Sequence, residues 1–220
     1  MCGRFYLDVP GEVLMEHFGL AAAPELAPRY NIAPTQAVAA VRAGSGGREL
    51  VRLRWGLVPA WAKGGRSPYR LINARAETVA DRPAFRDAFR RRRCLVPASG
   101  FYEWQARPDG RQPWAISAGP GPVFAIAGLW ERWEGEGRVV ESCTLLVTEA
   151  NAAVRPIHDR MPVILAPEDY AAWLDPRAQD PARLATLLRP CPAEGMRAWR
   201  VGRRVNSPAN DDPGCLEPLA

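Results

Sequence analysis

LVRLRWGLV, residues 50–58, is the stretch that decides the fold class. Its apolar residues Val51, Leu53 and Trp55 alternate with arginine and glycine. Alternation with a period of two is typical of a strand that has one buried and one solvent-exposed face. Further strands are predicted at residues 37–43, 112–118, 123–130, 142–149, 163–165 and 196–201. The sequence therefore predicts a protein built largely of β-strands.

Short helices are predicted between these strands. Apolar spacing and start signals indicate helices at residues 11–20, 81–93, 168–174 and 182–188. The prolines around RYNIAPT, residues 29–35, favour a surface loop there. With about eight or nine strands and about four or five short helices, mostly antiparallel, we expect an α+β fold. No repeat or low-complexity linker divides the chain, so residues 1–220 are expected to form one domain.

Composition limits the class of protein. The chain of 220 residues is 47% hydrophobic and 24% charged, which is ordinary for a globular protein. It contains no apolar run long enough to span a membrane, and charges at Arg4 and Asp8 argue against a signal peptide. Five dispersed cysteines without a CxxC pair, and only two histidines, predict neither disulfides nor a metal site. We expect a cytoplasmic protein that needs no cofactor.

The net charge of +5 comes almost entirely from arginine, because Lys63 is the only lysine. Arginine suits phosphate recognition, but a GC-rich genome is the larger cause of the bias, so charge alone is weak evidence for nucleic-acid binding. The basic run Arg90–Arg93 ends a predicted helix, where positive charge complements the helix dipole. Amine chemistry is therefore limited to Lys63 and the N-terminus.

The N-terminus, Met1-Cys2-Gly3-Arg4-Phe5, is chemically unusual. Removal of Met1 would leave Cys2 with a free α-amine beside its thiol. An α-amine has a pKa of about 7.7–8.0, so a useful fraction is nucleophilic at cellular pH. Such a 1,2-aminothiol condenses with an aldehyde to a Schiff base, on which the thiol closes to form a thiazolidine. Many proteins begin with Met-Cys by chance, so this dipeptide indicates aldehyde chemistry only if other residues of the chain support it.

Two other stretches offer proton carriers. Glu103 lies between Tyr102 and Trp104. If it is buried, desolvation raises the pKa of its carboxyl and makes it a general acid–base; an exposed strand glutamate is the equal alternative. His158 lies in a predicted loop beside two charged residues, where a functional role is more common than in a core.

Five stretches together resemble the SOS-response-associated peptidase (SRAP) family, also known as abasic-site processing proteins. They are MCGRF (1–5), RYNIAP (29–34), LINARAE (71–77), GFYEW (100–104) and IHDRMP (157–162). No single motif is specific, but the five in this order and spacing are. The end of the chain around Val205-Asn206 also resembles that family. The resemblance covers nearly the whole chain.

The resemblance implies a twisted β-barrel-like core with short peripheral helices and a positively charged channel for single-stranded DNA. It also implies that, in the response to DNA damage, Cys2 captures the ring-opened aldehyde of an abasic site as a thiazolidine, a link that can be reversed. The expected partner is single-stranded DNA containing abasic sites. The protein is expected to be a monomer without a metal or a membrane partner, and to lie on the nucleoid when bound to DNA.

The same resemblance implies roles for individual residues. Asn73 would hydrogen-bond the sugar and hold the N-terminus, Glu103 would move protons during Schiff-base formation, and His158 would act in ring opening and reversal. The residues expected to meet DNA are Arg4, Arg75 and Arg160 at the backbone and Pro34 and Trp104 beside the lesion.

Two other functions remain open. Cys2, His158 and Asn73 could form the Cys/His/Asn set of a cysteine peptidase, at most one that removes its own N-terminal residue. The chain could also be a module that binds single-stranded DNA without covalent chemistry. A requirement for the free amine separates capture from peptidase chemistry, and a covalent product separates capture from passive binding.

Overall fold

The computed structural model describes residues 2–66 and 71–219, so Met1, whose removal is expected, lies outside the described residues. Within these ranges the strands are β1 (Phe5–Leu7), β2 (Arg29–Ile32), β3 (Ala37–Gly44), β4 (Gly47–Trp55), β5 (Asn73–Arg75), β6 (Arg93–Ala98), β7 (Gly100–Arg107), β8 (Gly110–Ser117), β9 (Phe124–Gly135), β10 (Arg138–Glu149), β11 (Arg160–Pro162), β12 (Ile164–Leu165) and β13 (Arg197–Arg200). The α-helices are α1 (Gly11–Phe18), α2 (Arg86–Arg91), α3 (Tyr170–Leu174) and α4 (Pro181–Ala185). Short 3-10 turns are η1 (Lys63–Gly65), η2 (Pro167–Asp169), η3 (Arg203–Asn206) and η4 (Pro213–Cys215).

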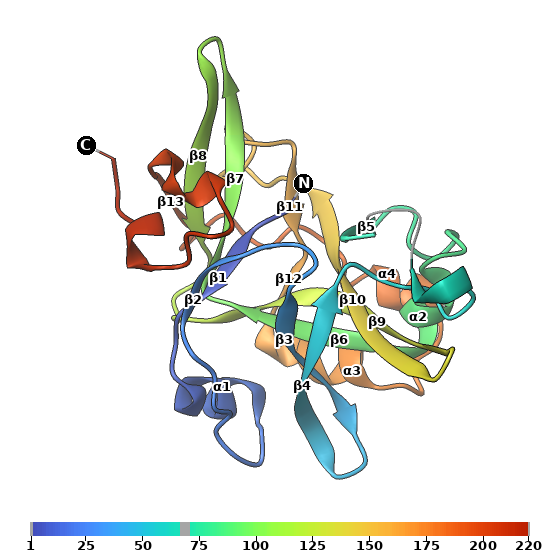
Figure 1. Cartoon of the computed structure of the whole chain (residues 1–220). Coiled ribbons are helices and arrows are strands. Elements are labelled where there is room, and N and C mark those ends of the chain that lie inside the picture. Colours follow the sequence, from blue (N-terminus) through green and yellow to red (C-terminus); the bar gives the residue numbers. More distant parts are fainter. Residues whose placement is uncertain (1, 67–70, 220) are drawn as a thin grey trace.

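Five strands close into a barrel at the centre of the molecule (Figure 1). The order β10-β4-β3-β6-β9 returns to β10, because β9 and β10 also pair as a long antiparallel hairpin. The pair β4–β10 is parallel, and the other pairs around the ring are antiparallel. Closure leaves no free sheet edge within the ring, which removes a route to aggregation. The expected fold, a β-barrel-like core with short peripheral helices, is confirmed.

A second, antiparallel sheet has the order β13-β8-β7-β1-β2. Its β7–β8 hairpin projects from the body of the molecule (Figure 1). The first strand of the chain, β1, is internal to this sheet, because it pairs with β7 through Phe5↔Phe101 and with β2 through Phe5↔Ile32. Phe5 also packs on Trp55 of the barrel, with ring centroids 5.3 Å apart. The N-terminus is therefore tied to both sheets.

The arginine run at the end of α2 has a structural role. Arg93 is 3% exposed. Its guanidinium donates to the carbonyl oxygens of Phe89, Arg90, Trp173, Asp175 and Ala178. Arg93 therefore satisfies the carbonyls at the end of α2 and fastens the segment after α3. The expected role at this helix end is confirmed for Arg93.

Some boundaries differ from the sequence predictions. Residues 29–35 were predicted as a surface loop, but 29–32 form strand β2. That strand exists because β1 pairs with one edge and Asp211 accepts the main-chain N–H groups of Tyr30 and Asn31, at 2.5 and 2.8 Å. The predicted strand 50–58 begins earlier, at Gly47, and ends at Trp55, because Gly56 has φ 124. No helix among the described residues is long and apolar enough to cross a membrane.

Candidate active site

Cys2 lies where the second sheet meets the barrel. It is fully buried, and its main-chain carbonyl accepts a hydrogen bond from Nδ2 of Asn73 at 2.8 Å. Asn73 opens β5, which pairs in parallel with β10 through Asn73↔Leu145. On the other side, the N–H of Tyr102 donates to the carbonyl of Arg4 at 2.9 Å, which extends the β1–β7 pairing towards Cys2. Two distant segments thus hold the N-terminus in place.

Glu103 faces this N-terminus from β7. It is 3% exposed, so the alternative of an exposed strand glutamate is wrong. Burial raises the pKa of its carboxyl from 4.5 to about 7. Glu103 lies close enough to Cys2 to affect its thiol. Burial is the main cause that raises the pKa of the Cys2 thiol, and the negative charge of Glu103 is the second. A carboxyl with a pKa near neutrality can both accept and donate a proton at cellular pH.

His158 is the third chemical group. Its Nε2 lies 3.9 Å from Oε2 of Glu103. Its Nδ1 accepts the main-chain N–H of Arg160 at 2.9 Å, so in the neutral ring Nε2 carries the proton and faces the glutamate. Burial lowers the pKa of His158. Oδ1 of the exposed Asp159 lies 2.9 Å from Nδ1 and can accept a hydrogen bond from that nitrogen only when Nδ1 carries a proton.

The Asn73 side chain donates a hydrogen bond to Cys2 through Nδ2, and it also has an acceptor atom, Oδ1. Its Oδ1 is buried and has no hydrogen-bond partner among the described residues. Buried polar atoms are nearly always paired, so such an atom indicates a place for a ligand or water. Cys2, Asn73, Glu103 and His158, the set that the family resemblance implies, thus come together where the second sheet meets the barrel.

A pocket of about 600 Å³ adjoins Asn73. Trp61, Arg75 and Arg82 are among its lining residues, and Trp61 is 61% exposed. Arg75 is exposed at the end of β5, on the same face of the strand as Asn73. An exposed indole beside arginines is the combination that binds bases and phosphates of a single strand.

Three of the other residues expected to contact DNA already bond to groups of the protein itself, and the fourth lies in a turn. Arg160 forms an ion pair with Glu77. Arg4 donates to Asn31 Oδ1 and to the carbonyl of Val205, both at 2.7 Å. Pro34 is half-buried in the turn between β2 and β3. Trp104 is half-buried, and its Nε1 donates to Oδ1 of Asn206 at 2.8 Å.

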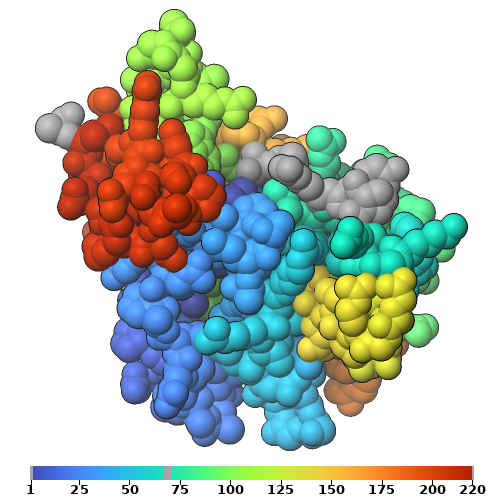
Figure 2. All heavy atoms as spheres, in the orientation of Figure 1, coloured from blue at the N-terminus to red at the C-terminus, as the bar shows by residue number. Residues whose placement is uncertain are grey.

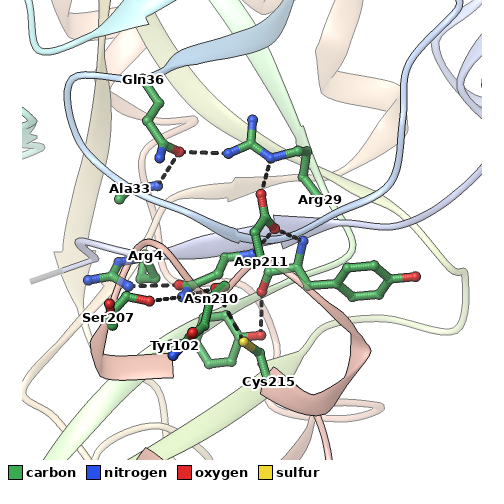
Figure 3. A network of polar contacts seen from close by, with 11 residues as sticks. Arg4, Arg29, Ala33, Gln36, Tyr102, Ser207, Asn210, Asp211 and Cys215 are labelled. Atoms are coloured by element: carbon green, nitrogen blue, oxygen red, sulfur yellow. Dashed lines mark hydrogen bonds and ion pairs between the residues drawn. The ribbon is translucent and has the colours of Figure 1, made fainter. Parts of the chain in front are cut away.

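The sequence interpretation missed Asn31 and Asp211, which belong to one hydrogen-bond network. Figure 3 shows Asp211 of this network beside Arg29. Asn31 is fully buried and bonds to both Arg4 and the end of the chain. Asp211 pairs with Arg29 and caps the free edge of β2. Asn31 stood inside a motif, but no local signal links it to residues some 180 positions away.

Fold and site together describe a β-barrel protein with a buried cysteine near its N-terminus and, beside it, a buried glutamate next to a histidine. The chain belongs to the family described as SOS response associated peptidase (SRAP), which it matches over residues 1–208. It is 40% identical over 222 residues to "Abasic site processing protein YoqW" of Bacillus subtilis (strain 168), covering 99% of each chain. It is 34% identical over 203 residues to "Abasic site processing protein HMCES" of Gallus gallus, covering 80% of this chain and 60% of that one.

Solved structures agree with the fold. A crystal structure of a protein from Bacteroides thetaiotaomicron superposes with a TM-score of 0.88 at 26% identity, over 100% of both chains. A protein from Bordetella bronchiseptica superposes with a TM-score of 0.80 at 27% identity, over 91% of this chain and 100% of that one. The SRAP-like fold expected from the sequence is therefore confirmed.

Proposed function

We propose that this protein, as one SRAP domain over residues 1–220, captures abasic sites in single-stranded DNA as a thiazolidine on Cys2. The observation that carries this proposal is the contact at 2.8 Å between Asn73 Nδ2 and the Cys2 carbonyl, which holds the N-terminus beside Glu103 and His158. The names of the relatives support the substrate, because they are abasic site processing proteins.

The chemistry begins once Met1 has been removed. The α-amine of Cys2 adds to the aldehyde carbon of the ring-opened deoxyribose, and the carbinolamine loses its hydroxyl as water to give a Schiff base. Glu103, with a carboxyl pKa of about 7, supplies the proton for that water and recovers one afterwards. The Cys2 sulfur then adds to the imine carbon, and the thiol proton passes to the nitrogen. The net change is loss of one water.

His158 and Asn73 complete the mechanism. A neutral imidazole whose Nε2 lies 3.9 Å from Glu103 can relay the proton that opens the sugar ring and the proton needed for reversal. The open Oδ1 of Asn73 is an acceptor for a hydroxyl of the opened sugar. Arg75, Trp61 and the adjoining pocket provide a path for the neighbouring strand.

The state of the thiol argues against a peptidase. A cysteine peptidase needs a thiolate, usually produced by a depressed pKa. Burial instead raises the pKa of Cys2 in the chain that still carries Met1. The hydrogen bond of Asn73 goes to Cys2, whereas in a papain-like set the asparagine orients the histidine. Amine-first chemistry needs no preformed thiolate.

The test is a denaturing gel of the purified protein, with Met1 removed, after incubation with abasic oligonucleotides. We expect a covalent band with abasic single-stranded DNA, much less with the lesion inside continuous duplex, and none with intact DNA. Added salt should weaken the non-covalent step. Absence of a covalent band while binding is retained would favour the passive binding module. Cleavage of peptides without a DNA adduct would favour the peptidase.

A further inference from the structure

The end of the chain, residues 203–215, forms a segment that we call the tail. In the space-filling view it lies beside the projecting β7–β8 hairpin and over segments from the first part of the chain (Figure 2). Asn31, on β2, holds the tail. Its Nδ2 lies 3.2, 3.0 and 2.7 Å from the carbonyl oxygens of Val205, Ser207 and Asn210. One buried amide therefore fixes three successive points of the tail.

The same amide reaches the N-terminal segment that contains Cys2 and leads into β1. Oδ1 of Asn31 accepts from Nη1 of Arg4 at 2.7 Å, and that nitrogen also donates to the carbonyl of Val205 at 2.7 Å. Arg4 directly precedes β1, two residues after Cys2. Asn31 consequently joins the N-terminal strand, β2 and the tail in one network.

The tail in turn holds Trp104. Oδ1 of Asn206 accepts from Nε1 of that indole at 2.8 Å, and the guanidinium carbon of Arg4 lies 5.8 Å from the ring centroid. A hydrogen bond at one edge and a cation over one face restrict the plane of the ring. Trp104 follows Glu103 on β7 and points to the opposite face of that strand. The Arg4 guanidinium over its ring, two residues after Cys2, places the ring beside the N-terminal segment that carries the proposed nucleophile.

We propose that Asn31 and Asn206 are positioning residues for DNA: Asn31 fastens the tail, and Asn206 fixes the ring of Trp104 on which a base beside the lesion stacks. This inference rests on the proposed function, because it requires single-stranded DNA at Trp104. It assigns the tail a part in substrate binding and none in bond formation. Both residues should therefore act on DNA affinity and leave the rate of the bound complex unchanged.

The experiment measures two quantities for each variant. One is the dissociation constant for intact single-stranded oligonucleotide by fluorescence anisotropy; the other is the cross-linking rate against abasic DNA concentration. Asn206→Ala should raise the dissociation constant and the half-saturating concentration about threefold to tenfold, the worth of one neutral hydrogen bond. Asn31→Ala removes the contacts with Arg4 and with three tail carbonyls, so it should raise both quantities by at least as much. The rate at saturation should stay within a factor of about two. Ala209→Ser, at an exposed position of the tail, is the matched control and should change neither quantity.

A double-mutant cycle separates positioning from a general loss of stability. Trp104→Phe keeps a stacking ring but removes the N–H that Asn206 accepts. In that background, Asn206→Ala should have little further effect on affinity. Additive effects of the two substitutions, or an affinity unchanged in Asn206→Ala, would overturn the proposal. Because Asn206 is exposed, its variant tests the idea even if Asn31→Ala folds poorly.

The two levels of inference fail differently. A wild-type protein that neither binds single-stranded DNA nor cross-links abasic DNA would contradict the proposed function itself. A wild-type protein that does both, with variants whose affinities equal its own, would contradict only the positioning role of Asn31 and Asn206.

Discussion

The side chain of Asn73 donates to the main-chain carbonyl of Cys2 across 2.8 Å, which joins the barrel to the first residues of the chain. The contact fixes the carbonyl and leaves the amine and thiol of Cys2 for chemistry. The other atom of that amide, Oδ1, is buried without a partner among the described residues. In the proposed function, this one amide holds the nucleophile and receives the substrate.

Asn73→Asp tests this relationship with a side chain of nearly the same shape. It replaces the N–H donor by a carboxylate oxygen that faces the Cys2 carbonyl, so Cys2 should lose its position. We expect single-turnover cross-linking to slow by about tenfold or more, because a group misplaced by about 1 Å can cost 10²-fold. Quenched time courses on denaturing gels measure the rate, and thermal melting checks the fold. A wild-type rate would show that the contact has no catalytic value.

Glu103→Gln should slow cross-linking by roughly 10²–10⁴-fold, or somewhat less if the N-terminal amine partly substitutes. The wild-type rate at subsaturating DNA should change near pH 7, the pKa of the Glu103 carboxyl, and the variant should lose this inflection. Rates measured from pH 5 to 9 test both statements. If the variant keeps the inflection near pH 7, the titration belongs to a group other than Glu103.

The same pKa shift predicts an effect on stability. Burial raises the pKa of Glu103 from 4.5 to about 7, so the folded state binds more protons than the unfolded state between these values. Wild-type stability should therefore fall as pH rises through this window and level off above it. The penalty at pH 8 should be of the order of 3 kcal/mol. Urea unfolding at pH 5 and pH 8 should show that Glu103→Gln loses this dependence.

His158→Ala should slow both formation and reversal of the cross-link, because the proposed proton relay serves both directions. Formation is followed on gels, and reversal by transfer of the protein to a second abasic oligonucleotide in excess. Asp159→Asn is the matched control at the neighbouring exposed residue, and it should change either rate by less than about threefold, since exposed ion pairs contribute little. A His158→Ala protein that reacts and reverses at wild-type rates would make the histidine structural.

An additional residue before Cys2 that is not removed tests the aminothiol itself. It keeps the thiol but converts the amine into an amide, which cannot condense with an aldehyde, so the cross-link should disappear. Cys2→Ala should instead form only a Schiff base that borohydride traps, with some strand cleavage. A stable adduct formed by the extended protein would point to a thiol-only mechanism, unless Lys63, the only lysine, proves by peptide mapping to carry the DNA.

Arg93→Met tests the scaffold away from the site. The substitution leaves the carbonyls of α2 and of the segment after α3 without their buried donor, so unfolding free energy should fall by about 3 kcal/mol or more. Arg90→Met, at an exposed position of the same helix, should cost less than about 0.5 kcal/mol. Urea titrations compare them. If the two variants were equally stable, water would be able to replace the hydrogen bonds that Arg93 donates to these carbonyls.

The strand content could be predicted from the sequence because it depends on local pattern, and the candidate site residues could be named because five motifs resemble those of a known family. Alternation along residues 50–58 indicated a strand, and β4 covers most of that stretch. The motifs around Cys2, Asn73, Glu103 and His158 pointed to one site without any knowledge of distance. The strand at residues 29–32 could not be predicted from local pattern, because it is held by β1 and by Asp211, which lie far from it in the sequence.

The sequence by itself determined that this is a mainly β protein and that a Cys2 freed of Met1 would carry an amine beside a thiol. Only the tertiary structure decided that Glu103 is buried, and it is burial that brings the pKa of its carboxyl to about 7. It also decided that Asn73 reaches Cys2 and that Asn31 holds the tail. Composition and alternation are properties of neighbouring residues, whereas desolvation and hydrogen bonding depend on groups that the folded chain brings from far along its length.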